Sequence, residues 1–371
     1  MKILIFNWQD IYNPFGGGAE SHLHEIFKRI AAMGNDVTLY CCKVNDFSEE
    51  ENIDGIRVLR QGGRNLFNFF VPFRYFKQFK NENYDIIIDD INKIPFYTPL
   101  FINKPLLAIS HHFFGKSIFR EASFIEGLYV YFSEWLVNII YKNTPFAVVS
   151  QSTLDEFIRR KFNQNHFTII TNAIEAKEFP MKVAEKPSYP IITYFGRLKK
   201  YKSVDHLVIA FAQINKQFPQ AQLHFIGRGS FQPELVKLAK QLGIKDKTIF
   251  HGFVDEDKKK ELLSNSYVVV NTSMKEGWGI TNIEANACGT PVISADVPGL
   301  KDSVKKDVSG LLYEYGNIND LSDKLKMFLS DDNLKERLSN GAVEWAASFS
   351  WDNSAKEMIA LCNKVIANHK L

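Results

Sequence analysis

Short apolar runs alternate with helix-like segments along the chain, and this alternation restricts the fold more than any other feature. The runs expected as strands in the first half are 3–6, 37–42, 56–60, 85–89, 106–110, 146–150 and 167–171. Runs that are short and apolar throughout indicate parallel strands with helices on both faces. We therefore expect a doubly wound α/β domain.

The same pattern restarts after the polar stretch 182–189, which contains Pro187 and is typical of a linker. Further strands are expected at 191–195, 222–226, 248–251, 267–271 and 291–294, and the last helices at 318–329, 332–349 and 351–369. A chain of 371 residues is also too long for one ordinary core. We predict domains at 1–181 and 188–349, with the helix at 350–371 crossing back to the first. Such domains bind ligands at the carboxyl ends of their strands, so a cleft between the two is expected.

Composition excludes several classes of protein. The net charge is only +3, with basic and acidic residues evenly spread, which argues against a nucleic-acid partner. The four cysteines form no C-x-x-C pair, so neither a zinc site nor a disulfide framework is indicated. The first apolar run is too short for a signal peptide, and no run is long enough to span a membrane. A cytoplasmic protein is expected.

Two glutamates enclose a glycine-rich turn in the second domain. Residues 276–284 read Glu-Gly-Trp-Gly-Ile-Thr-Asn-Ile-Glu, and the helix that follows the turn is expected to end at Gly289. The glycines allow close backbone approach, and the amides near residues 279–281 would favour a phosphate at the helix N-terminus. Glu276 and Glu284 could then accept hydrogen bonds from sugar and ribose hydroxyls. The alternative is a helix cap followed by a solvent-facing glutamate.

Arg197 and Lys202 follow the first strand of the second domain. Fixed cations at the carboxyl edge of the sheet would stabilise the negative charge on a departing phosphate. Lys199 and Lys200 lie between them, so the alternative is a solvated basic turn.

The first domain offers a glycine loop and a histidine. Residues 14–20 read Pro-Phe-Gly-Gly-Gly-Ala-Glu, but G-x-G-x-x-G and an acidic end to the second strand are missing, which excludes the dinucleotide fingerprint of a dehydrogenase. His111 follows the strand at 106–110 and is expected at the same edge of the sheet. A buried structural histidine is the alternative.

These segments resemble the signatures of retaining glycosyltransferases of family 4, which have the GT-B fold of two Rossmann-like domains facing across a cleft. Their pattern E-G-F-G-x-x-x-x-E matches residues 276–284, with Trp278 in place of Phe. Their pattern G-R-x-x-x-x-K-G matches residues 196–203, with Ser203 in place of the second Gly. The resemblance runs from about residue 3 to about 360 and is sparse between about 43 and 105.

The resemblance implies an enzyme that moves a sugar from a nucleoside-diphosphate sugar to a hydroxyl of a glycan, lipid-linked or small-molecule acceptor, with retention of anomeric configuration. Arg197, Lys202, His111 and Glu276 would be the catalytic residues. The residues implied in donor binding are Gly17, Gly18, Gly227, Phe253, Val254, Gly277, Trp278, Gly279, Ile280, Thr281 and Glu284. No cofactor and no metal ion are expected. A GT-B-fold epimerase, a phosphorylase and a non-catalytic subunit are the alternatives.

The stretch 64–80 interleaves aromatic residues with Arg64, Arg74, Lys77 and Lys80. A basic aromatic helix of this kind can lie on an anionic bilayer, which leaves a peripheral contact with the inner face of the membrane open. The alternative is a core helix with Phe73 and Phe76, and with them Phe69 and Phe79, facing inward.

Overall fold

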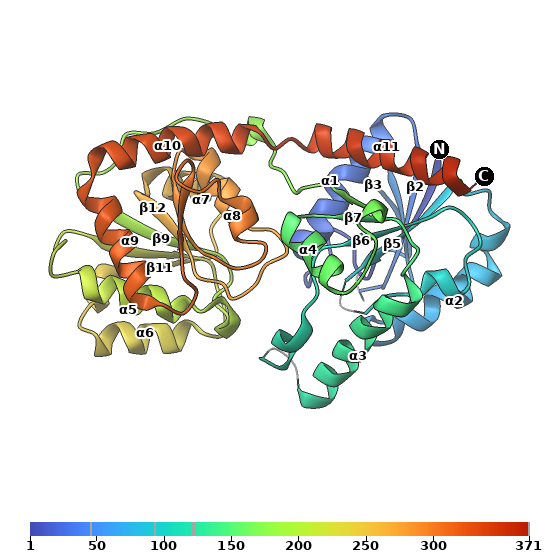
Figure 1. Ribbon diagram of the computed structural model, residues 1–371, viewed down its shortest axis with the longest axis horizontal. Helices are drawn as coiled ribbons and strands as arrows, with labels where there is room; N and C mark the ends of the chain where they lie inside the picture. The colour runs from blue at the N-terminus through green and yellow to red at the C-terminus, as the bar shows by residue number, and fades with distance from the viewer. Residues whose placement is uncertain (45–46, 93, 121–122, 370–371) are drawn as a thin grey trace. The chain divides into compact units, whose positions relative to one another are not determined.

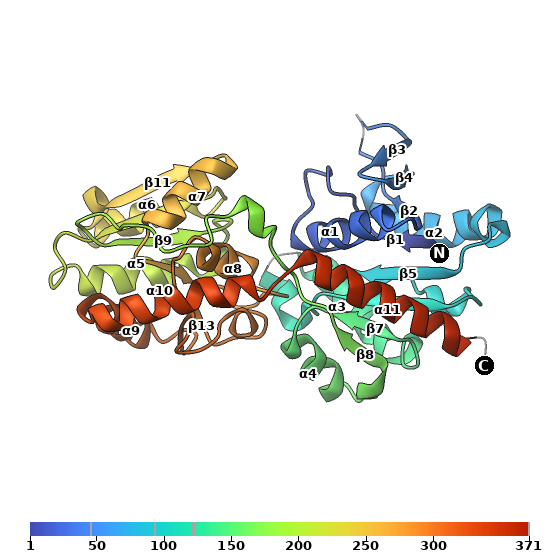
Figure 2. The same cartoon turned by 90° about the horizontal axis from the view of Figure 1, so that it is seen from above.

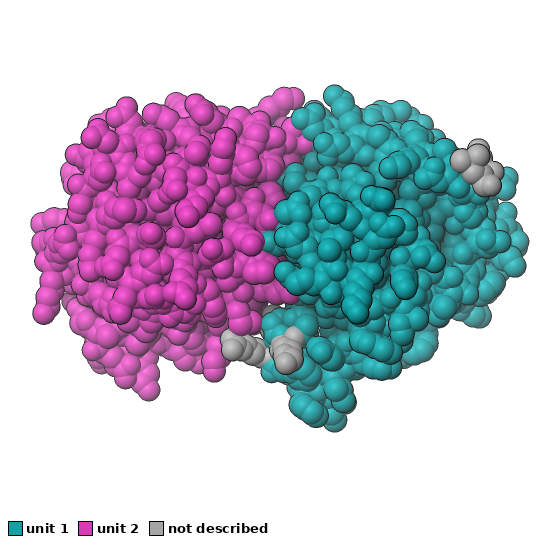
Figure 3. All heavy atoms as spheres, viewed as in Figure 1, with its two compact units in different colours: residues 1–172, 351–371 teal, residues 173–350 magenta. Residues whose placement is uncertain are grey.

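The computed structural model describes residues 1–44, 47–92, 94–120 and 123–369, and the chain divides into two compact units. Unit 1 comprises Met1–Asn172 with Trp351–Leu371, and unit 2 comprises Ala173–Ser350 (Figure 3). The division falls after Asn172 rather than at 181, because the segment after it is bound to unit 2, where the Met181 amide donates to the Ala287 carbonyl at 2.8 Å.

Unit 1 is built on an eight-stranded sheet in the order β3-β4-β2-β1-β5-β6-β7-β8. The strands are β1 Lys2–Phe6, β2 Asp36–Cys41, β3 Glu50–Ile53, β4 Ile56–Arg60, β5 Ile86–Ile91, β6 Leu106–Ser110, β7 Phe146–Val148 and β8 Phe167–Ile169. The helices are α1 Gly18–Ala32, α2 Phe67–Lys77, α3 Phe124–Ile140, α4 Gln151–Arg159 and α11 Trp351–His369. Helix α11 lies beside α1 (Figures 1 and 2), where Arg29 Nε is 2.7 Å from Asp352 Oδ1.

Strand β3 was not predicted. It is the edge strand and pairs antiparallel with β4, with Glu50 opposite Leu59 and Ile53 opposite Ile56. The other pairings in this sheet are parallel. Because an edge strand needs little apolar surface, its sequence Glu-Glu-Asn-Ile lacks the apolar run that marks the buried strands.

Unit 2 is built on a six-stranded parallel sheet in the order β11-β10-β9-β12-β13-β14. The strands are β9 Ile191–Phe195, β10 Gln222–Ile226, β11 Thr248–Gly252, β12 Val268–Asn271, β13 Val292–Ala295 and β14 Gly310–Tyr313. The helices are α5 Val204–Ile214, α6 Gln232–Gln241, α7 Glu256–Asn265, α8 Ile280–Ala287, α9 Ile318–Ser330 and α10 Asp332–Ala347. Strand β14 was also missed, because it has only four residues and begins at a glycine.

The prediction of two doubly wound domains is confirmed, and the strand order fixes where each can bind a ligand. In unit 2 the order reverses between β9 and β12, and in unit 1 between β1 and β5. Loops leaving adjacent strands at such a point run to opposite faces of the sheet and leave a crevice at the strands' carboxyl ends. In unit 2, the residues that follow β9 and β12 are therefore the strongest candidates for a ligand site.

The burial pattern of α2 corrects which side chains of the stretch 64–80 face inward. Phe67, Val71, Tyr75 and Phe79 are buried at a spacing of four residues, whereas Phe69, Phe73 and Phe76 are exposed. The inward face was therefore assigned wrongly for Phe69, Phe73 and Phe76 and correctly for Phe79. No helix among the described residues is long and apolar enough to cross a membrane.

Candidate functional site

At the carboxyl edge of the unit 2 sheet, backbone packing leaves no room for a side chain at Gly227. Gly227 has φ of +126°, and a Cβ there would lie 2.1 Å from the Gly196 carbonyl oxygen. The Gly196 amide donates to the Ile226 carbonyl at 3.0 Å, and the Gly227 amide to the Gly252 carbonyl at 2.8 Å. Three neighbouring strand ends are thus fixed by their main chains, so the loops that leave them start from rigid positions.

Lys202 and Glu276 are brought together by these loops. Lys202 ends a short 3₁₀ turn after β9, Glu276 lies in the loop after β12, and Nζ of Lys202 forms an ion pair with Oε1 of Glu276. Both side chains are mostly buried, with 13% and 21% exposed. The Thr272 hydroxyl donates to the Lys202 carbonyl at 2.8 Å and holds the turn in place. A lysine ammonium and a glutamate carboxylate therefore meet where the strand order of unit 2 reverses.

Ser203 occupies a left-handed backbone conformation, with φ of +48°. This conformation favours glycine, which explains why the resembling motif has Gly at this position. Here the Ser203 hydroxyl lies 2.9 Å from the Tyr315 hydroxyl, a contact that glycine could not make.

Arg197 is exposed at the start of the same loop, and its Nη2 donates to the Tyr201 hydroxyl at 3.4 Å. Among the described residues of the loop, this long hydrogen bond is the one that anchors the guanidinium, so the group is available to an anion.

Glu284 is paired with a lysine that the sequence did not single out. Its Oε1 lies 2.8 Å from Nζ of Lys259 in α7, and the same ammonium is 2.6 Å from Glu256. Burial raises the pKa of Glu284, and the nearby Lys259 only partly opposes this. Burial also acts to lower the pKa of Lys259, but Glu284 and Glu256 outweigh it and raise that pKa. Glu284 is therefore held in place by its partner.

The turn before α8 is tightly packed. Gly279 is the N-cap, and a Cβ there would lie 2.4 Å from Ser303 Oγ. Ile280 and Thr281 begin the helix and are half-buried, as is Gly277 before them. Trp278 is buried and packs edge-on against Phe349, so it supports the turn from inside unit 2.

The loop after β11 carries the two remaining residues expected in unit 2. Phe253 is 76% exposed, and Val254 is half-buried against the core under β10 and β12. An aromatic ring this exposed is available for stacking on a ligand.

In unit 1, His111 lies at the end of β6 and its Nε2 is 3.1 Å from Oδ1 of Asp90 in β5. Burial acts to lower the pKa of His111, but the Asp90 carboxylate outweighs it and raises that pKa. His22 of α1 meets the His111 ring edge-on at 5.2 Å. Burial, and then His111, lower the pKa of His22 to about 3. His22 is therefore the neutral member of the pair, with Nε2 bound at 3.2 Å to the Ile170 carbonyl.

The glycine loop leads into α1. The Gly17 amide donates at 2.7 Å to Oε2 of Glu20, a buried carboxyl whose pKa is raised by burial. An anion seeking the Gly17 amide would have to displace Glu20. At Gly18 a Cβ would meet nothing within 4 Å, so this position is open.

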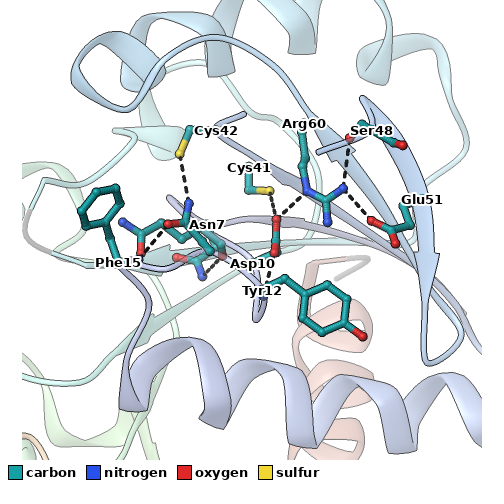
Figure 4. Close-up of polar contacts among 11 residues, drawn as sticks. Asn7, Asp10, Tyr12, Phe15, Cys41, Cys42, Ser48, Glu51 and Arg60 are labelled. Carbon is teal, nitrogen blue, oxygen red and sulfur yellow. Dashed lines mark hydrogen bonds and ion pairs between the residues drawn. The ribbon is translucent and has the colours of Figure 1, made fainter. Parts of the chain in front are cut away.

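A buried ion pair holds the start of the same loop (Figure 4). Arg60 Nε at the end of β4 lies 2.6 Å from Asp10 Oδ2, and both side chains are almost fully buried. The other Asp10 oxygen accepts from the Tyr12 amide at 2.9 Å. Lys259, His22, Asp90 and this pair were all missed by sequence reasoning, because each depends on contacts between distant segments.

Comparison with known proteins identifies the family. The Glycosyltransferase Family 4 model matches residues 16–178, and the model for Glycosyl transferases group 1 matches residues 175–345. The chain is 28% identical to an uncharacterized glycosyltransferase of Methanocaldococcus jannaschii, across 97% of both chains.

Solved structures with the same fold cover nearly the whole chain. Sucrose-phosphate synthase from Thermosynechococcus elongatus matches with a TM-score of 0.80 and 23% identity, over 99% of both chains. HepE of Anabaena, solved in complex with UDP-glucose, matches with a TM-score of 0.75 and 19% identity, over 98% of this chain and 100% of that one. The chain belongs to the glycosyltransferases of the GT-B fold and consists of a family 4 domain followed by a group 1 domain.

Proposed function

We propose that this glycosyltransferase moves a sugar from a nucleoside-diphosphate sugar to an acceptor hydroxyl and retains the anomeric configuration. The observation that carries the proposal is the pairing of Lys202 with Glu276 at the switch point of unit 2, beside the exposed Arg197. HepE, which has the same fold, was solved with UDP-glucose, and this supports a nucleotide-sugar donor.

The donor diphosphate would bind Arg197 and Lys202. When Lys202 turns to the phosphate, Glu276 is left to accept hydrogen bonds from hydroxyls of the transferred sugar. Glu284, held by Lys259, would accept hydrogen bonds from the ribose. Phe253 would lie against the base, and His111 in unit 1 would contact the transferred sugar.

The bond between the anomeric carbon and the phosphate oxygen breaks, and both electrons leave with the nucleoside diphosphate. The two cations stabilise this leaving group more in the transition state than in the bound donor, which lowers the barrier. The acceptor oxygen attacks the oxocarbenium-like carbon on the face that the phosphate leaves, and its proton passes to the departing phosphate oxygen. Because attack and departure share one face, configuration is retained. The chain's own cations supply the positive charge, so we expect full activity in EDTA.

The test begins with donor identity. UDP, GDP, ADP and CMP are screened by thermal shift, and a ligand at 100 times its dissociation constant should add about 2.7 kcal/mol of stability. Sugar conjugates of the nucleotide that binds best are then incubated with a panel of hydroxyl acceptors, and the anomer of the product is assigned by NMR. Inversion of configuration would refute the retaining reaction, and absence of binding to every nucleotide would refute the donor assignment.

A further inference from the structure

Helix α3 exposes the more apolar of its two sides. Its outward side chains include Phe124, Ile125, Leu128, Phe132, Trp135 and Ile139, and Ile125 is 80% exposed. Its buried side consists of Gly127, Val130, Ser133, Glu134 and Val137, which are smaller or more polar. A helix on a water-facing surface shows the reverse distribution, and soluble proteins rarely leave so continuous an apolar strip uncovered. Figure 1 shows α3 on the outside of unit 1, extending away from the strands.

Helix α2 continues this apolar surface. Its exposed Phe69, Phe73 and Phe76 lie on the side opposite its buried residues. An open pocket of about 340 Å³ lies between the two helices, lined among others by Phe69, Pro72, Phe132 and Leu136. The Asn68 amide donates to the Tyr129 hydroxyl at 3.4 Å and links the two helices. We call the exposed apolar side chains of α2 and α3 the α2–α3 face.

Cations border this face. Lys77 Nζ lies 5.7 Å from the centre of the Phe73 ring, and Lys80 Nζ lies 5.5 Å from that of Phe76. The two lysines are exposed, so their aliphatic stems lie along apolar surface while their charges reach solvent. In α2 and α3 the acidic residues are Glu126 and Glu134, of which Glu134 is buried. The face is therefore bordered by cations on its α2 side, whereas α3 has no cation and one exposed carboxylate, Glu126.

We propose that the α2–α3 face docks on an anionic lipid bilayer, with its aromatic and aliphatic side chains among the acyl chains and its lysines at the headgroups. Apolar side chains next to cations match the acyl chains and negative headgroups of such a surface. A second copy of the chain fits less well. A two-fold interface would bring the same face of both copies together, so each copy would add Lys77 and Lys80 to it, and Glu126 is the one exposed carboxylate on the two helices that could offset them.

The test is flotation of the full chain with vesicles of phosphatidylcholine alone and with phosphatidylglycerol added. We expect wild type to float with the anionic vesicles. Ile125→Glu combined with Phe132→Glu should lower the bound fraction by about tenfold or more. Lys77→Gln with Lys80→Gln should lower it by ~5-fold for each cation and only on anionic vesicles. Val236→Glu with Met327→Glu, which changes exposed apolar residues of unit 2, is the matched control and should bind like wild type.

Neither donor nor acceptor enters this measurement, so its outcome is independent of the proposed transfer reaction. Unaltered thermal unfolding establishes that each variant is folded. Wild type that stays unbound with both vesicles, or equal binding by the Ile125→Glu, Phe132→Glu variant, overturns the proposal. A concentration-dependent dimer that the same variant dissociates would also overturn it and assign the face to a second copy.

Discussion

Nζ of Lys259 lies 2.8 Å from Oε1 of Glu284, so a lysine of α7 fixes the carboxylate that would hold the donor ribose. The pair is mostly buried, with 10% and 15% of the two side chains exposed. A carboxylate in such a place is disfavoured by burial unless a cation compensates it. Lys259 therefore acts as a positioning residue for Glu284.

Lys259→Met should remove this compensation and raise the pKa of Glu284 further. A carboxyl whose pKa is raised by folding loses stability as pH rises from its unfolded value through its folded value. The loss of unfolding free energy relative to wild type should therefore be larger at pH 8 than at pH 5, on the order of 1–3 kcal/mol. Urea unfolding at the two pH values measures it. Adding Glu284→Gln should remove the pH dependence, and an equal loss at both pH values would contradict this account.

Arg197→Ala and Lys202→Ala should each lower turnover by on the order of 10²-fold or more, because each removes a fixed cation from the leaving phosphate. Initial rates with saturating donor measure this. Lys200→Ala is the control, since Lys200 is an exposed cation of the same loop and matches no motif position. Near-normal turnover in either variant, or an equal loss in Lys200→Ala, would remove the proposed role.

Asp90→Asn should destabilise unit 1 more at pH 6 than at pH 9. The Asp90 carboxylate raises the pKa of buried His111. The stability that a histidine gains in this way is present below its unfolded pKa and is lost as pH rises through the folded pKa. His22, with its pKa lowered to about 3, acts in the opposite direction in both proteins, so it cancels in the difference. Thermal unfolding of both proteins across this range tests the prediction, and a difference that does not change with pH would contradict it.

Gly227→Ala should lower stability, whereas Gly18→Ala should affect donor binding with little effect on stability. At Gly227 a Cβ would lie 2.1 Å from a carbonyl oxygen in a strained backbone conformation, so Tm should fall by an amount equivalent to roughly 1–3 kcal/mol. At Gly18 a Cβ meets nothing within 4 Å, so stability should stay within ~1 kcal/mol while the donor KM rises if the donor approaches this backbone. An unchanged KM in Gly18→Ala would place the donor elsewhere.

The sequence predicted what depends on local pattern. Apolar runs identified the central strands, and their alternation with helices implied the parallel sheets. Spacing along single loops placed Glu276 and Lys202 at one sheet edge, because the carboxyl ends of β9 and β12 are adjacent. Strand β3 was not predicted, because an edge strand can be polar and then lacks an apolar run.

Contacts between distant segments could not be predicted. The Lys259–Glu284 pair depends on how α7 packs beside α8, and no motif encodes it. The outward apolar side of α3 was not predicted from the sequence, for a related reason. Residues 124–140 are apolar on almost every side, and periodicity cannot then distinguish a core helix from one with an uncovered face.

Arg60→Met tests whether the buried ion pair with Asp10 positions the glycine loop. Both side chains are at most 3% exposed, and losing one partner leaves an unpaired buried charge that costs about 3–5 kcal/mol. Arg60→Met with Asp10→Asn removes both charges, so it should recover much of the stability without restoring the loop's anchor (Figure 4). Urea unfolding should then show the double variant more stable than the single one. The donor KM should be higher than that of wild type in both the single and the double variant, because the segment that leads to Gly17 is no longer tied to β4. A double variant with wild-type KM would show that the pair only stabilises the fold.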